Sequence, residues 1–386
     1  MSTQRIPAVF MRGGTSKAVV FHACDLPESS AERAAMFLHV LGSPDPNQRQ
    51  LDGLGGGLSS LSKVVIVESS QRPGVDVDYT FAQVAVDRPV VDYSSMCGNM
   101  SSSVGPFAVD ERLVEVEDGE ARVRIYNTNT NKVFHARFAV QDGKAVEAGD
   151  FQIPGVPGTG ARITLGYQDP GGAATSGLLP SGKVRDQLDV PELGEIEVSL
   201  VDATNPVVFV RASDLGYTAT EVPEVLEADP SLLQRLDTIR RQGGVLMGMA
   251  ESTEAVHLAN PKVALVGPAA PFTALDGNNY TPESHDLAVR IVSMERMHRA
   301  ITLTGAMCTV AAVGVEGSIP YEFATSCAPL RIGNPSGVLS VEANICNEGN
   351  GRFTAVSVTS YRTQRRLMEG SVLVPSRLLN PRPRSN

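Results

Sequence analysis

The sequence predicts a strand-rich α+β fold made of two related halves. The first observation is an internal repeat: residues 97–104 read CGNMSSSV and residues 304–311 read TGAMCTVA, with Gly, Met and small residues in the same order. The second is a series of short apolar runs between Gly, Pro and Asp turns, a pattern typical of strands. Helical patterns are few and do not alternate regularly with these runs, unlike in a doubly wound fold. An element repeated once per half indicates two similar domains that face each other.

The individual elements follow in chain order. Apolar runs predict strands at 18–21, 64–67, 84–86, 122–126 and 207–210. Helical patterns predict helices at 31–41, 100–113, 223–242, 285–299 and 307–315. Ser29 and Ser30 offer a cap for the first of these helices, and Gly42 ends it.

The boundary between the halves is expected near Leu178–Lys183, because a Gly-, Ala- and Ser-rich stretch ends there. We therefore expect an N-terminal domain over 1–182 and a C-terminal domain over 183–386, whose last strand can return to the first domain. The Pro- and Arg-rich tail from Pro375 is expected to fray.

Composition narrows the class of protein. The chain has 386 residues, 42% of them hydrophobic, and a net charge of -10, without a Lys/Arg run, an apolar signal stretch or an apolar run of membrane-spanning length. Its five cysteines, at 24, 97, 308, 327 and 346, show no metal-ligand spacing. We expect reduced thiols in the cytoplasm, no metal or cofactor, no nucleic-acid or membrane partner, and a homodimer or homotetramer.

The segment Arg12-Gly13-Gly14-Thr15-Ser16-Lys17 directly precedes a predicted strand. Paired glycines let backbone N–H groups face a cleft, and the hydroxyl and ammonium groups that follow bind anions. The spacing is not that of a Walker A loop. The alternative interpretation is a tight turn that carries a surface lysine.

Lys63 follows a Gly- and Ser-rich loop and begins the apolar run Val64–Val67. Only six lysines are present against 27 arginines, so its position is notable. A lysine at the mouth of an apolar strand is partly desolvated, which lowers its pKa and makes it a usable general base. The alternative is a flexible loop whose lysine begins a strand at the surface.

Cys97 precedes an expected helix start at Gly98-Asn99-Met100. Free N–H groups and the positive end of the helix dipole lower the pKa of a thiol and hold carboxylates there. The alternative is a small buried apolar residue. The repeat places Thr304-Gly305-Ala306-Met307 opposite this segment, and packing is the better interpretation for Cys308.

Gly333-Asn334-Pro335-Ser336-Gly337 predicts a turn between strands. The side chains of Asn334 and Ser336 could contact a ligand, although ordinary turn chemistry also explains them. Met294, Met297 and His298 fall on an expected helix and are interpreted as packing or capping residues.

Taken together, these motifs resemble the PrpF-like family of 2-methylaconitate isomerase, methylitaconate Δ-isomerase and 4-oxalomesaconate tautomerase. The resemblance runs nearly end to end. It rests on the segments 11–17 (MRGGTSK), 42–45 (GSPD), 52–53 (DG), 62–63 (SK), 76–84 (DVDYTFAQV), 97–99 (CGN), 104–108 (VGPFA), 127–130 (NTNT), 179–182 (LPSG), 214–218 (DLGYT), 335–337 (PSG) and 366–370 (RLMEG).

The resemblance implies a diaminopimelate-epimerase-like fold, in which each domain wraps strands around a central helix and the active site lies between the domains. It also implies a cofactor-free isomerase of a small unsaturated di- or tricarboxylate, with Lys63 and Cys97 as the catalytic pair. The sequence departs from the family pattern at Ala18, Lys183, Asn334, Gln364 and Met307-Cys308, which leaves the substrate open.

The expected chemistry is a 1,3-allylic proton shift through a dienolate. Lys63 is the expected base and Cys97 the proton donor, although the two roles can be reversed. The N–H groups at Gly98-Asn99 and Gly305-Ala306 would stabilise the enolate oxygens. An amino-acid racemase is the rival on the same fold, but it would need a second thiol where Thr304 stands. A silent carboxylate-binding protein is the other alternative, and it would not need both catalytic groups.

Overall fold

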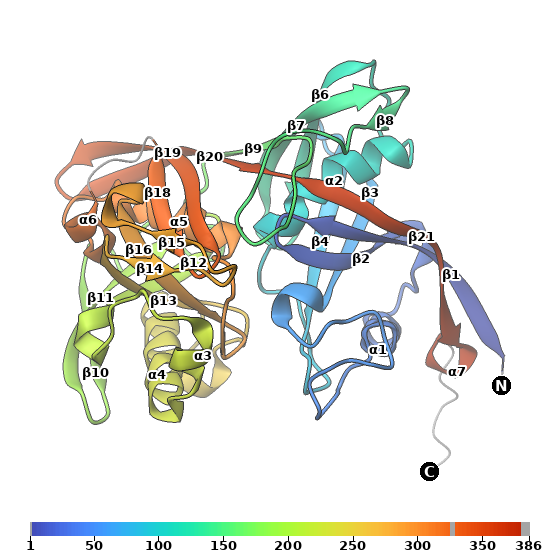
Figure 1. Ribbon diagram of the computed structural model, residues 1–386. Coiled ribbons are helices and arrows are strands. Elements are labelled where there is room, and N and C mark those ends of the chain that lie inside the picture. The colour runs from blue at the N-terminus through green and yellow to red at the C-terminus, as the bar shows by residue number, and fades with distance from the viewer. Residues whose placement is uncertain (1, 325–328, 380–386) are drawn as a thin grey trace, which may run out of the picture.

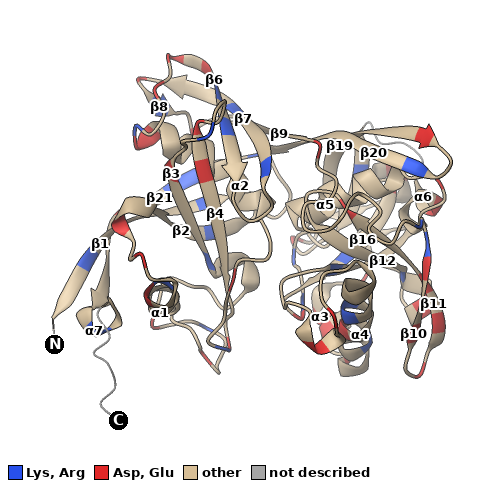
Figure 2. Cartoon of the chain, turned by 180° about the vertical axis from the view of Figure 1, so that it is seen from behind, with Lys and Arg blue, Asp and Glu red and all other residues tan. Residues whose placement is uncertain are grey.

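The computed structural model describes residues 2–324 and 329–379, so Cys327 and most of the tail that was expected to fray lie outside the described residues. Figure 1 shows two lobes side by side, one formed by the first half of the chain and one mainly by the second. No helix in the described ranges is long and apolar enough to cross a membrane. Acidic and basic residues are interspersed over both lobes (Figure 2).

The strands of the first half are β1 (Thr3–Gly13), β2 (Ser16–His22), β3 (Lys63–Ser69), β4 (Val77–Val84), β5 (Val91–Asp92), β6 (Gly119–Asn127), β7 (Lys132–Gln141), β8 (Lys144–Ala145) and β9 (Ile163–Gln168). Those of the second half are β10 (Asp186–Val190), β11 (Gly194–Asp202), β12 (Pro206–Arg211), β13 (Lys262–Pro268), β14 (Phe272–Thr273), β15 (Asn279–Tyr280), β16 (Leu287–Ser293), β17 (Arg296–Met297), β18 (Leu330–Asn334), β19 (Gly337–Gly349), β20 (Arg352–Arg362) and β21 (Gln364–Pro375).

The helices are α1 (Ser30–Leu41), α2 (Gly98–Asp110), α3 (Pro223–Glu227), α4 (Pro230–Leu246), α5 (Leu303–Val313), α6 (Ile319–Phe323) and α7 (Ser376–Leu379). Short 3-10 turns cover Ala23–Asp25, Ser59–Leu61, Ala212–Leu215, Thr253–Ala255 and Pro282–Ser284.

The internal repeat extends far beyond the helix motif. In the first half, β2 is parallel to β3, β3 antiparallel to β4, β4 parallel to β6 and β6 antiparallel to β7. The strands β12, β13, β16, β18 and β19 repeat this series with the same directions. Helices α2 and α5 occupy the same place in the two series, so the halves share one topology.

Each half folds its strands around one buried helix. Every residue of α5 is buried, and so is every residue of α2 except its last. Both helices consist almost entirely of apolar and small residues, which suits a helix enclosed on all sides. Their side chains join one apolar core that continues across both halves, and this core fixes the two helix starts in space.

The last strands bind the two lobes together. Strand β20 pairs with β9, and β21 runs antiparallel to β1 along nearly its whole length. Figure 1 shows these long strands passing from the second lobe to the first. The segment 178–183 lies between β9 and β10, and the division into domains at that point stays a prediction.

Two predicted helices differ from the structure. The stretch 285–299 was expected to be a helix, and this is wrong: Leu287–Ser293 forms β16, flanked by β13 and β18. Its Val and Ile residues suit a strand buried on both faces, and positive φ angles at Met294 and Glu295 reverse the chain into β17. The expected helix 223–242 is divided, because Pro230 begins α4 with Asp229 as its cap. Helix α1 is confirmed, with Ser29 as its N-cap.

Candidate active site

A small pocket lies where the two halves meet. Its cavity measures about 30 Å³, and both halves line it: Ser16, Lys63 and Cys97 come from the first, and Lys262, His298 and Thr304 from the second. A larger hollow of about 310 Å³ lies on the same seam, but its Arg88 and Glu295 are paired with each other. Of these two pockets, the smaller one brings together the buried ionisable groups Lys63, Lys262 and His298, which makes it the candidate active site.

Lys63 begins β3 and is only 6% exposed. Its Nζ donates a 2.6 Å hydrogen bond to Gln83 Oε1 and lies 5.0 Å from the centre of the Phe81 ring. The Gln83 amide in turn donates to the carbonyl oxygens of residues 59 and 62, which fixes its orientation. Burial lowers the pKa of Lys63, and the neighbouring Cys97 side chain acts against this. A lysine with a lowered pKa is a better base near neutral pH.

Cys97 is the N-cap of α2, so the expected helix start at Gly98 is confirmed. Its carbonyl oxygen accepts hydrogen bonds from Tyr79 Oη at 3.2 Å and from Ser101 Oγ at 3.0 Å. No side chain caps this helix. The first N–H groups of a helix have no partner within it, so those of Gly98, Asn99 and Met100 remain available beside the thiol. The arrangement suits both a thiolate and a bound carboxylate.

Lys262 is a site residue that the sequence interpretation missed. It begins β13, as Lys63 begins β3, so the two lysines occupy equivalent positions in the repeat. Its Nζ donates to the Ala259 carbonyl oxygen at 3.1 Å. Burial, assisted by the charge of Lys63, lowers the pKa of Lys262 to about 8. The scarcity of lysine and the apolar strand that follows were the signals available in the sequence.

The second helix start differs from the expectation. Helix α5 begins at Leu303, with Thr302 as its N-cap. The Gly305 N–H donates to Thr302 Oγ1 and the Ala306 N–H to the Thr302 carbonyl oxygen. Because both groups are already used, they cannot stabilise an enolate as expected. A threonine hydroxyl is a favoured N-cap, which explains the earlier start.

The two helix starts touch each other. A Cβ atom added at Gly98 would lie 3.0 Å from Thr304 Cγ2 and 3.2 Å from Leu303 Cβ. Thr304 therefore closes the pocket opposite Cys97. It supplies a hydroxyl and no thiol.

The glycine-rich segment forms the tip of the β1–β2 hairpin, which packs on the start of α2. Cβ atoms added at Gly13 and Gly14 would lie 2.7 Å from Asn99 O and 2.4 Å from Asn99 Oδ1. Thr15 and Ser16 line cavities. The remaining two side chains are placed elsewhere. Lys17 lies over the Phe10 ring at 5.5 Å, and Arg12 donates to the carbonyl oxygens of residues 14 and 363.

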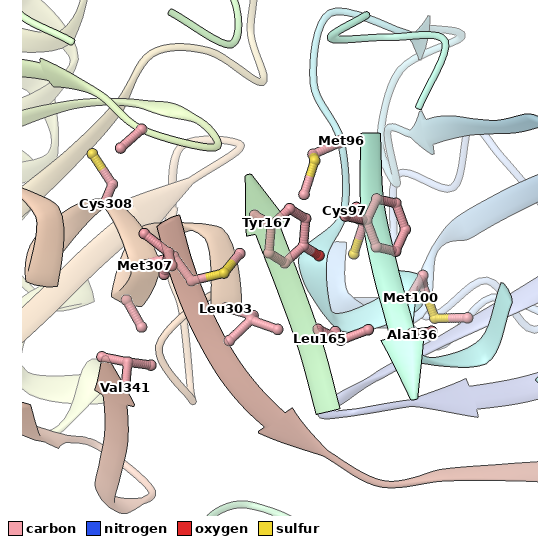
Figure 3. Close-up of a cluster of buried hydrophobic side chains, with 14 of the residues drawn as sticks. Met96, Cys97, Met100, Ala136, Leu165, Tyr167, Leu303, Met307, Cys308 and Val341 are labelled. Atoms are coloured by element: carbon pink, nitrogen blue, oxygen red, sulfur yellow. The ribbon is translucent and has the colours of Figure 1, made fainter. Parts of the chain in front are cut away.

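The remaining predicted positions serve packing and turns. Met100, Ala306 and Met307 are fully buried in the core. Figure 3 shows Cys308 and Cys97 on opposite sides of the buried cluster between the halves. Burial raises the pKa of the Cys308 thiol. The Asn334 side chain accepts from the Ile301 N–H and donates to the Gly337 carbonyl oxygen, and Ser336 Oγ donates to the Arg299 carbonyl oxygen.

His298 also lies in the pocket, although it was predicted to pack or cap. Its Nδ1 contacts the Ala300 carbonyl oxygen. Burial, with the nearby charge of Lys63, lowers its pKa to about 3, so the imidazole is neutral at physiological pH. The described residues bring no group of three or more His, Cys, Asp or Glu together in a way that could hold a metal ion.

Comparison with known proteins gives strong matches over the whole chain. The chain is 37% identical over 391 residues to the 2-methyl-aconitate isomerase of Shewanella oneidensis, covering 96% of this chain and 97% of that protein. It is 40% identical over 382 residues to the 3-methylitaconate isomerase of Eubacterium barkeri, covering 97% and 98%.

Solved structures agree with this result. A crystal structure of methylitaconate-delta-isomerase has 38% sequence identity and a TM-score of 0.77, with both chains covered over 100% of their length. A hydroxyproline epimerase of Agrobacterium vitis shares the fold at 12% identity and a TM-score of 0.55, over 96% of this chain and 92% of that one. The expected epimerase-like α+β fold is therefore confirmed. The model of the PrpF protein family matches residues 3–375, and the chain belongs to this family.

Proposed function

We propose that this chain is a cofactor-independent isomerase that moves a C=C bond within a small unsaturated di- or tricarboxylate. The observation that carries the proposal is that Lys63 and Cys97 line one small pocket at the start of α2. The names of the relatives, which include a methylaconitate and a methylitaconate isomerase, support the same reaction class. Candidate substrates are 2-methylaconitate, methylitaconate, aconitate and oxalomesaconate.

The proposed reaction begins with neutral Lys63, whose Nζ removes a proton from a carbon beside a C=C bond conjugated with a carboxylate. The electron pair of that C–H bond forms a new C=C bond, and the electrons of the old one move onto the carboxylate as a dienolate. Cys97 then donates its proton to the far carbon of the allyl unit. The lysine ammonium then returns its proton to the thiolate, since both groups line the same small pocket. The same steps are possible with the two roles reversed.

The pocket offers two kinds of group that stabilise the dienolate. The N–H groups of Gly98, Asn99 and Met100 lie at the positive end of α2. Lys262, with a pKa of about 8, is mostly charged at pH 7 and faces the same space from the other half. Preorganised donors and charges at the developing oxyanion supply much of the rate enhancement in such sites.

The cavity volume bears on how a substrate is admitted. About 30 Å³ of cavity holds roughly two water molecules, less than a six-carbon acid requires. We therefore propose that the halves separate when the substrate enters and close around it afterwards. Contacts that cross the seam, such as Arg88 with Glu295 at 2.8 Å, would break during that motion. The cysteines of the described residues are free, which is compatible with the cytoplasmic location proposed for the enzyme.

The alternatives make different demands on the site. A racemase on this fold would need a second acid or base opposite Cys97, and Thr304 is poorly suited to that role. A silent carboxylate-binding protein would bind the acids without reacting with them.

The test is incubation of the metal-stripped protein with each candidate acid, followed by proton NMR for migration of the double bond. We expect one acid to isomerise with the wild type and none with Lys63→Ala or Cys97→Ser, while Cys308→Ser stays active. Binding of the acids without isomerisation would favour the silent protein. Full activity of both pocket variants would contradict the mechanism.

A further inference from the structure

A buried arginine at the end of β20 has no acidic partner. Arg362 is 2% exposed. Its Nε donates to Asn99 Oδ1 at 3.1 Å and its Nη1 to the Tyr361 carbonyl oxygen at 2.8 Å. Among the described residues, Nη2 has no acceptor and the guanidinium forms no ion pair. A buried charge without a counter-ion is costly, and where its guanidinium lines a cavity, as that of Arg362 does, an anion in the cavity can offset this cost.

Arg362 lines a second small cavity of about 10 Å³, together with Thr15, Ile153 and Asn334. This cavity adjoins the catalytic pocket. Thr15 and residues 300–301 line the second cavity, whereas their chain neighbours Ser16 and residues 302–304 line the catalytic pocket.

Asn99 lines the catalytic pocket, and its side chain bonds to two residues of the second cavity. Its Oδ1 accepts from Arg362, and its Nδ2 donates to Thr15 Oγ1 at 3.0 Å. An acid held against the start of α2 can therefore extend past Asn99 toward the guanidinium. A cavity of this size accepts about one water-sized atom, such as one carboxylate oxygen.

We propose that Arg362 binds a third carboxylate, remote from the reacting carbons, and that the substrate of this chain is therefore a tricarboxylate. The inference rests on the proposed isomerase function and specifies its substrate class. The catalytic pocket already offers cationic Lys262 and the α2 N–H groups to the carboxylates beside the double bond. Arg362 lies beyond them, and a guanidinium suits a carboxylate because its N–H groups form a planar fork.

Two acids test the proposal as a matched pair. trans-Aconitate and mesaconate share the same unsaturated diacid, but the methyl group of mesaconate is replaced by CH2–COO⁻ in trans-aconitate. Affinities for both are measured by calorimetry on the wild type and on Arg362→Gln. We expect Arg362→Gln to weaken trans-aconitate binding by roughly 10- to 100-fold, as expected for a lost charge-assisted hydrogen bond, and to leave mesaconate binding unchanged.

Arg290 provides the matched control. It is 1% exposed and donates only to the carbonyl oxygens of Glu221 and Val289. Burial lowers its pKa to about 10, as it does for Arg362. Arg290 lines neither cavity, so Arg290→Gln should lower the melting temperature without changing the affinity ratio of the two acids.

An equal loss of affinity for both acids, or no loss for either, would overturn the role of Arg362 and leave the isomerase proposal standing. Wild-type protein that binds neither acid would overturn the proposed function together with the inference. If Arg362→Gln does not fold, Arg362→Lys decides the question. It keeps the charge but loses the fork, and it should reduce the preference for trans-aconitate only partly, whereas an unchanged preference would contradict the proposal.

Discussion

Replacing Lys262 by methionine should remove the free-energy cost of burying a charged lysine in the pocket. Burial lowers the pKa of this lysine from 10.5 to about 8. Below about pH 8 the folded and unfolded chains both hold the proton, so the folded state bears the full cost of a buried charge. Between pH 8 and 10.5 the unfolded chain binds more protons, and the stability of the wild type rises with pH. A pKa difference of about 2.5 corresponds to roughly 3 kcal/mol.

The assay is the free energy of unfolding in urea for wild type and Lys262→Met at pH 7, 9 and 10.5. Over this pH range the free energy of unfolding of the wild type should rise by roughly 3 kcal/mol relative to that of the variant. Lys183→Met is the matched control, because the Lys183 side chain is 71% exposed and its curve should run parallel to that of the wild type. If the free energy of unfolding of Lys262→Met also runs parallel to that of the wild type over this pH range, the pKa of Lys262 is not lowered.

Two further predictions concern the packing around the site. Gly14 has a φ of 50°, and an added Cβ would lie 2.4 Å from Asn99 Oδ1. Gly14→Ala should therefore cost about 1–3 kcal/mol and weaken carboxylate binding in calorimetry. Gly248→Ala, at a φ of 72° with open space around it, should keep full affinity, and equal affinities for the two variants would contradict the packing role. Cys308, whose pKa is raised by burial, should resist iodoacetamide at pH 8.5 until urea unfolds the protein, and mass spectrometry that finds it modified as fast as exposed Cys24 would contradict this.

Local patterns predicted the parts of the site that lie close together in the sequence. Cys97 and Gly98 were recognisable because a thiol followed by a small, apolar segment indicates a helix start, and the structure confirms that start. Lys63 was notable because of the glycine-rich loop before it. Lys262 follows Asn-Pro and has no such loop, so its equivalence to Lys63 became visible only through the strand pairings of the two halves.

Contacts between distant segments could not be predicted. Arg362 reaches Asn99 across 263 positions, and this contact exists only because β20 returns from the second lobe to pair with β9. The stretch 285–299 was interpreted as a helix from its local pattern alone. Tertiary pairing on both sides of β16 outweighed that local preference.

Lys63 and Cys97 are proposed to carry the proton between the two ends of an allyl unit. Deuterium entry from D2O into the isomerising acid, followed by proton NMR, tests it most directly. We expect migration of the double bond with deuterium entry for the wild type and Cys308→Ser, and no migration above background with Lys63→Ala or Cys97→Ser. Deuterium entry at the wild-type rate in both pocket variants would contradict it.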